Sequence, residues 1–308
     1  MSAEGHGDLA DPTELAALYE RIAETLAEAD PQEKVRRTEA LWVGLAGAAL
    51  DQGAPALDRC PLDPVAASVP PPTSPLAPAA GRPARPRLVP PKALPQRGLS
   101  TREGHAALIH SLVHIEFTAI NLALDHAFRF RGLPPAYLAD WLRVAVEEAR
   151  HFTALGAHLG TLGHGYGDFD AHGGLWEMAE RSGAALDLRM AVVPCTLEAR
   201  GLDATPGIMD RLAEIGDEGG IACLRVILAE EIGHVAAGRR WLHYACGRLG
   251  VDPAARYREI LGEVLRGRGP RPPFNEAARL AAGFLPEEIA WLAQAAAGGA
   301  FRSTAEEV

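Results

Sequence analysis

Two glutamate–histidine patterns in this sequence have the residue types and the spacing of a metal site. Each contains a Glu-x-x-His motif and a lone glutamate about thirty residues upstream. The six residues are Glu116, Glu148 and His151 in the first copy, and Glu198, Glu231 and His234 in the second. Residues three apart lie on one face of an α-helix, so the glutamate and histidine of each motif can bind one ion. Four carboxylates and two imidazoles are the ligand set of di-iron and di-manganese sites in helical bundles.

The distances along the chain indicate which elements position these residues. Glu116 precedes Glu148 by 32 residues (148−116), and Glu198 precedes Glu231 by 33 (231−198). We therefore expect each pair on consecutive helices of an antiparallel hairpin. A single Glu-x-x-His occurs often as a solvated pair, but two copies with matched upstream glutamates favour a metal site. Apolar segments at 142–146 and 226–229 run into the motifs, and buried carboxylates are costly unless they are paired or bound to metal.

Neighbouring polar residues leave alternatives for the ligand set. The doublets Glu147-Glu148 and Glu230-Glu231 each offer two glutamates, and the i, i+3 spacing favours the second of each. Glu147 and Glu230 are then expected to face solvent or to orient an arginine. His114 points about 200° around the helix from Glu116, which predicts a structural or orienting role for His114 and leaves the role of His110, four residues earlier, open.

Ligating histidines also need a hydrogen-bond partner on the second ring nitrogen. Three aspartates are candidates that the sequence alone does not rank: Asp125, Asp203 and Asp217.

Composition restricts the partners of this protein. The 308 residues carry a net charge of −10 with a pI of about 5.6, so a nucleic-acid partner and an anionic membrane are not expected. No stretch is expected to reach a membrane-spanning length, and the first residues lack a secretory signal pattern. The four cysteines form no C-x-x-C pair, which is typical of reduced thiols in a cytoplasmic protein.

Four segments are expected along the chain. They are an N-terminal helical hairpin (1–53), a proline-rich linker (54–99), a four-helix bundle (100–250) and a C-terminal helical extension packed on the bundle (251–308). In the bundle, Ser100 and Glu103 predict a capping box at the first helix. Pro194 predicts a kink in the third helix, which is expected to end near residue 201. The fourth helix is expected from about residue 217 to 249, with Gly250 as its stop.

The segments around the six residues resemble the ferritin-like "domain of unknown function 455" family. The similarity rests on residues 112–116, 147–152, 197–203 and 230–235, with further similarity at 166–168 and 273–279. It reaches from the N-terminal hairpin to about residue 292 and departs mainly in the proline-rich linker. The resemblance implies an all-α, ferritin-like bundle, and all six residues match the ligand pattern of that superfamily. The family brings no settled reaction, but its distant ferritin-like relatives include di-iron tRNA hydroxylases, rubrerythrin-like peroxidases, manganese catalases and ferroxidases.

These observations favour the hypothesis that the chain is a non-haem di-metal protein. Glu148 and Glu231 would bridge two iron ions, with manganese as the alternative metal, because carboxylate-rich sites suit these ions more than zinc. The expected activity is that of an oxidase or hydroxylase that uses dioxygen, or peroxide, on an unknown small-molecule substrate. A ferroxidase, a manganese catalase or peroxidase, and a non-catalytic helical scaffold are the alternatives. A homodimer is an open alternative for the assembly.

Overall fold

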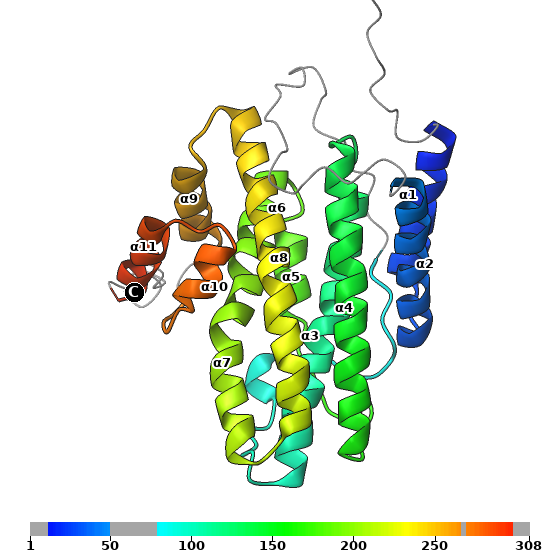
Figure 1. The fold of residues 1–308 in the computed structure, drawn as a ribbon, viewed down its shortest axis with the longest axis vertical. Coiled ribbons are helices and arrows are strands. Elements are labelled where there is room, and N and C mark those ends of the chain that lie inside the picture. Colours follow the sequence, from blue (N-terminus) through cyan, green and yellow to red (C-terminus); the bar gives the residue numbers. More distant parts are fainter. Residues whose placement is uncertain (1–11, 50–78, 266–268, 298–308) are drawn as a thin grey trace, which may run out of the picture. The chain divides into compact units, whose positions relative to one another are not determined.

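The structure is a computed structural model and describes residues 12–49, 79–265 and 269–297. Over these ranges the chain is helical and contains no strand (Figure 1). A parallel bridge between Leu88 and Ala171 is the isolated extended pairing found in this part of the chain. The all-α helical prediction is therefore confirmed, whereas the relation to ferritins stays a prediction.

The chain divides into two compact units, each built from two separate segments of the sequence. The first comprises Met1–Pro86 and Glu116–Thr153, and the second comprises Arg87–Ile115 and Ala154–Val308. Helices α3 (Arg102–Arg129) and α4 (Pro135–Thr161) each contribute one end to either unit. The four-segment division expected from the sequence stays a prediction, and its residues 50–78 lie outside the described ranges.

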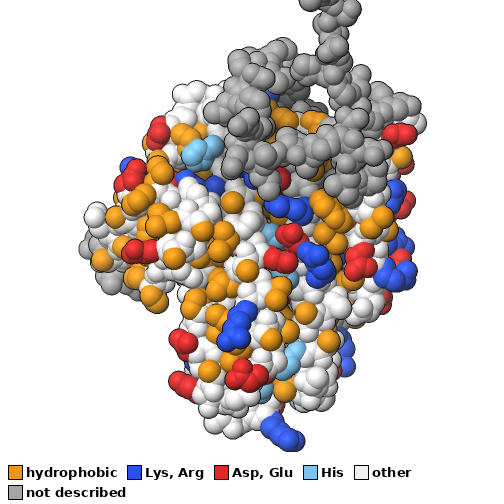
Figure 2. All heavy atoms as spheres, in the orientation of Figure 1, with side chains coloured by type: hydrophobic (Ala, Val, Ile, Leu, Met, Phe, Trp, Pro, Cys, Tyr) orange, Lys and Arg blue, Asp and Glu red, His pale blue; other side chains and the backbone are white. Residues whose placement is uncertain are grey.

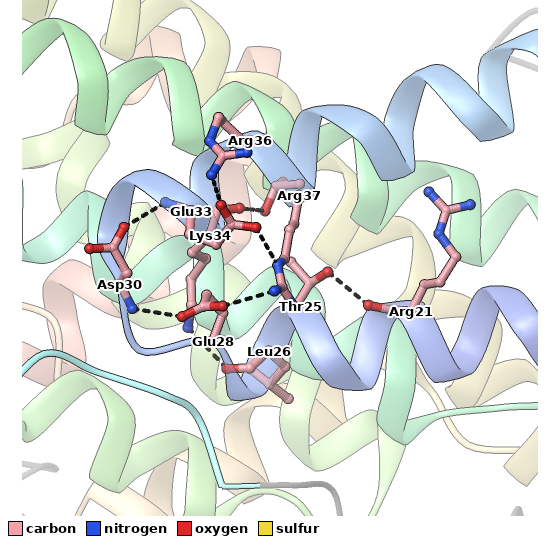
Figure 3. A network of polar contacts seen from close by, with 10 residues as sticks. Arg21, Thr25, Leu26, Glu28, Asp30, Glu33, Lys34, Arg36 and Arg37 are labelled. Carbon is pink, nitrogen blue, oxygen red and sulfur yellow. Dashed lines mark hydrogen bonds and ion pairs between the residues drawn. The ribbon is translucent and has the colours of Figure 1, made fainter.

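In the first unit, α1 (Pro12–Ala27) and α2 (Pro31–Ala49) form a hairpin. Asp30 caps α2 by accepting a hydrogen bond from Glu33 N at 2.8 Å, and Pro31 follows at a position where proline is favoured. The polar network of the hairpin is drawn in Figure 3. At its centre, the buried Lys34 Nζ donates to Leu26 O (2.9 Å), to Gly81 O (2.8 Å) and to Asn121 Oδ1 on α3. Lys34 thereby fastens the hairpin to the helix that carries Glu116.

The second unit contains a long helical hairpin and the C-terminal helices. Its helical run consists of α6 (Leu186–Val192), the π-helical turn η3 (Val193–Glu198) and α7 (Ala199–Glu214), and it packs against α8 (Glu218–Leu249). The turn between α7 and α8 has Gly216 at φ 73°. Asp217 caps the start of α8, and Gly250 ends it in the left-handed conformation (φ 69°), as the sequence predicts.

Shorter elements complete the second unit. They are η2 (Pro91–Ala93), α5 (Gly174–Arg181), α9 (Pro253–Leu265), α10 (Glu276–Ala281) and α11 (Pro286–Ala297). Two buried arginine–carboxylate pairs hold the last helices: Arg239 binds Glu288 at 2.7 and 3.0 Å, and Arg279 binds Asp203 at 2.6 and 2.9 Å. On the face drawn in Figure 2, acidic, basic and apolar side chains are interspersed.

Two predicted helix ends are wrong. The third bundle helix does not end near residue 201, because α7 continues to Glu214. Its internal glycines and Pro206 disfavour a helix by about 1 kcal/mol per glycine and about 3 kcal/mol for the proline, so packing against α8 and η3 must hold it. The cap of α3 is Thr101 rather than Ser100, since Thr101 Oγ1 accepts a hydrogen bond from Gly104 N at 3.0 Å. Glu103 pairs with Arg97 at 3.2 Å instead of closing a capping box.

The expectation that no stretch reaches membrane-spanning length is also wrong. Among the described residues, α3 passes that test, with a mean hydropathy of 1.5 over its most apolar 18-residue window. However, 67% of that window is buried inside the fold, as in the core helix of a soluble protein. The cellular compartment stays a prediction.

Candidate metal centre

Glu116, Glu148 and His151 form a buried cluster in the first unit. Glu116 comes from α3, and the other two come from one face of α4. His151 Nδ1 lies 3.3 Å from Glu148 Oε2 and 3.4 Å from Glu116 Oε2. The three residues are 2%, 0% and 4% exposed for His151, Glu148 and Glu116 respectively. Three ligand atoms therefore converge from two helices on one point inside the protein.

The pattern of α4 explains why its motif faces inward. Ala145, Ala149 and Phe152 are buried beside Glu148, and the Phe152 ring lies 5.6 Å from that of Phe117 on α3. Glu147 is 18% exposed and lies 3.8 Å from Arg150 across the helix surface. This is the register expected from the i, i+3 spacing.

The electrostatics of the cluster call for positive charge. Burial raises the pKa of Glu116 well above its usual range, and the neighbouring Glu148 carboxylate raises it further. Burial alone lowers the pKa of His151, but its contacts with Glu116 and Glu148 outweigh this and raise the pKa to about 11. Two buried carboxylates are thus balanced only if one keeps a proton and the imidazole stays charged. A divalent cation can replace both protons, so this donor set fits a metal ion.

The second motif lies on α8 in the second unit. His234 is fully buried, and its Nδ1 lies 3.6 Å from Glu231 Oε2. The Glu231 side chain is 13% exposed, so this pair is closer to solvent than the first. The i, i+3 geometry is nevertheless the same, with both side chains on one face of the helix.

Glu198 occupies the last position of the π-helical turn η3. Pro194 is the second residue of this turn and packs against Gly238 of α8, where a Cβ atom would lie only 2.3 Å from the Pro194 Cβ. On the other side, the Tyr257 hydroxyl of α9 donates to Cys195 O at 3.0 Å. The structure shows a π-helical turn at this proline, and the predicted kink stays a prediction. Such turns occur frequently at functional sites.

The six predicted ligands are thus distributed over the two units. Glu116, Glu148 and His151 are brought together in the first, and Glu231 pairs with His234 in the second, with Glu198 on η3. The joining of the two sets through bridging by Glu148 and Glu231 stays a prediction.

His110 and His114 hold the loop at 162–173. His110 Nε2 accepts a hydrogen bond from Gly167 N at 3.0 Å, and His114 Nδ1 lies 2.9 Å from the Tyr166 hydroxyl. Burial lowers the pKa of His110 to about 4, so its ring is neutral and suited to accept that bond. Both contacts are those of structural histidines.

The three aspartates considered as partners of ligating histidines have other contacts. Asp125 binds Arg129 at 2.7 and 3.0 Å, and Asp203 binds Arg279. Asp217 contacts His105 and His158, a second histidine-containing group that the sequence did not single out, because its members come from three helices.

Comparisons with known proteins agree with the resemblance seen in the sequence. The family model described as "Protein of unknown function (DUF455)" matches residues 27–290. An uncharacterized protein of Haemophilus influenzae is 38% identical over 289 residues, which are 90% of this chain and 94% of that protein. No solved structure gives a significant match. This all-α protein contains a buried carboxylate–histidine cluster that could hold a metal ion. The chain belongs to the DUF455 family.

Proposed function

We propose that this protein is a non-haem di-metal carboxylate enzyme, with two iron ions, that activates dioxygen for the oxidation or hydroxylation of a small molecule. The observation that carries the proposal is the buried cluster of Glu116, Glu148 and His151. Glu116 and His151 are assigned as terminal ligands of one ion, and Glu198 and His234 as those of the second. Glu148 and Glu231 are assigned as bridging ligands.

The alternative of a metal-free polar core is less favourable on physical grounds. Buried charges that lack a partner cost about 3–5 kcal/mol when one member of a pair is removed. Without a metal, the stability of two carboxylates around one imidazole depends on the protonation of each group. A divalent cation would instead bind all three side chains at once. Hence the residue types support a metal site more than a structural one.

The donor set also favours iron or manganese over zinc. Structural zinc sites are tetrahedral and rich in thiolate or imidazole, whereas here carboxylates outnumber imidazoles two to one. A bound pair of iron ions would supply two-electron oxidation by dioxygen. The protein's own contribution is positioning: α3 and α4 hold the ligands, and Phe117 and Phe152 keep the surroundings apolar.

Elemental analysis of the purified protein tests the proposal. We expect about two iron ions per chain in the wild type, and loss of both in a His151→Ala, His234→Ala double variant. Glu147→Ala, Glu230→Ala is the matched control, because it removes the neighbouring glutamate of each doublet and should leave the metal content unchanged. Fe(II)-loaded protein should then consume dioxygen.

Two results would contradict the proposal. Wild-type protein that binds neither Fe(II) nor Mn(II) after anaerobic reconstitution would leave only a helical scaffold. Manganese in place of iron, with turnover of hydrogen peroxide and no dioxygen consumption, would favour a catalase or peroxidase.

A further inference from the structure

A second group of potential ligands lies in the second unit, formed by His105, His158 and Asp217. His105 belongs to the first turn of α3, His158 to the last turn of α4, and Asp217 caps α8. Their side chains are 16%, 12% and 5% exposed. His105 Nε2 lies 2.6 Å and His158 Nε2 lies 2.9 Å from the same Asp217 Oδ2 atom. Three helix ends thus direct two imidazoles and one carboxylate to one point.

The Asp217 carboxylate is held by the backbone in an orientation suited to a ligand. Its Oδ1 atom accepts a hydrogen bond from Gly220 N at 2.9 Å, while Oδ2 faces the two rings. In metal sites, ligating carboxylates are commonly fixed in this way by a hydrogen bond from outside the coordination shell.

Two glycines after Asp217 provide an independent observation. A Cβ atom on Gly219 would lie 2.8 Å from two atoms of the His158 ring, and one on Gly220 would lie 2.5 Å from Asp217 Oδ2. Glycine costs a helix about 1 kcal/mol relative to alanine, yet both occur in the first turn of α8. Their lack of side chains leaves the space that the group occupies. The local sequence therefore gives up helix propensity in favour of this arrangement.

We infer that His105, His158 and Asp217 bind a divalent first-row transition ion, with Zn²⁺ as the best fit. Two imidazoles and one carboxylate form a common three-residue zinc ligand set, and the partial exposure leaves a fourth position for water. Zinc–nitrogen bonds of about 2.0–2.1 Å place tetrahedral donors roughly 3.3 Å apart. The His105 nitrogen would therefore withdraw from Oδ2 by about 0.7 Å (3.3−2.6) and the His158 nitrogen by about 0.4 Å (3.3−2.9), movements that a change of side-chain rotamer at a helix end can supply. The ion would fasten the ends of three helices.

Zinc titration by calorimetry, in the His151→Ala, His234→Ala background, tests this site separately from the carboxylate centre. We expect one Zn²⁺ per chain. His105→Gln and His158→Gln should each weaken binding by at least the roughly 10–100-fold that loss of an outer-shell partner causes, because each removes one of three ligands. His164→Gln is the matched control: His164 lies 3.7 Å from Asp168 in a pair with a single histidine, and its loss should leave zinc binding unchanged.

A second pair of variants tests the role of the glycines. Gly219→Ala should displace the His158 ring and weaken zinc binding by about 10-fold or more, as expected when a ligand is misoriented. Gly247→Ala, on the same helix with open space around it, should have no effect on binding. No zinc binding in the background protein, or unchanged affinity in both glutamine variants, would overturn the proposal. The three side chains would then serve only as a hydrogen-bonded contact between helix ends. If the background protein does not fold, the same titration on wild-type protein preloaded with Fe(II) gives the answer, with anomalous scattering at the zinc edge to locate the ion.

Discussion

Gly238→Ala tests whether the π turn η3 positions the second set of proposed ligands, Glu198 and His234. A Cβ atom at Gly238 would lie 2.3 Å from the Pro194 Cβ, whereas ordinary contacts begin near 3.4 Å. The helices must therefore separate locally by about 1.1 Å (3.4−2.3), or η3 must shift. Overpacking of this kind costs typically 1–3 kcal/mol. Because His234 lies one turn before Gly238 and Glu198 ends η3, we also expect loss of one of the two metal ions.

Urea unfolding and elemental analysis of the same samples measure both effects. Gly247→Ala is the matched control: it makes the same change on the same helix where nothing lies within 4 Å, so it should stabilise the protein by up to about 1 kcal/mol and leave the metal unchanged. A Gly238→Ala variant as stable as the wild type, with full metal content, would refute the reasoning that this contact holds η3 in place.

Three further predictions follow from single contacts. Burial lowers the pKa of Lys34 to about 7, so between pH 7 and 10.5 the unfolded chain binds more protons at this residue than the folded one. The free energy of unfolding of the wild type, measured against Lys34→Met, should therefore rise over this range, by up to about 1.4 kcal/mol per pH unit. Parallel curves would show that Lys34 stays charged. Tyr257→Phe removes the hydrogen bond to Cys195 O and should cost about 1 kcal/mol in urea unfolding, with partial metal loss, whereas unchanged values would argue against a role in holding η3. Fe(II) at a thousand-fold excess over its Kd should stabilise the wild-type protein by about 4 kcal/mol. Glu148→Gln should abolish this stabilisation, whereas Glu147→Gln should retain it. Equal shifts of Tm in both variants would contradict the assignment of Glu148 as a ligand.

The local features of the site were predictable from the sequence because helical spacing alone determines them. The three-residue interval places Glu148 and His151 on one face of α4, and Glu231 and His234 on one face of α8. By contrast, the form of the chain at Pro194 was not predictable. A proline indicates only that one backbone donor is missing, and whether a π turn forms there depends on contacts with distant elements.

The group of two histidines and one aspartate was not predicted from the sequence, because its members come from different helices. His105, His158 and Asp217 are 53 and 59 residues apart along the chain (158−105 and 217−158), so no local period connects them. The two glycines after Asp217 were visible in the sequence, but their purpose became clear only once the His158 ring was seen against Gly219. Sequence patterns within one helix therefore identify half of a site well, whereas sites assembled from helix ends require the fold.

The two halves of the proposed di-metal centre differ in ways that bear on its chemistry. The first set lies entirely in the interior, with both carboxylates held by continuous α-helices. In the second, Glu231 is partly exposed and Glu198 ends a π turn that α9 holds through Tyr257. π turns occur frequently at functional sites, and this one places Glu198 where η3 meets α7. In the proposed assignment, Glu116 and His151 would hold one ion in the interior, whereas the partly exposed Glu231 marks the side from which a small substrate would reach the centre.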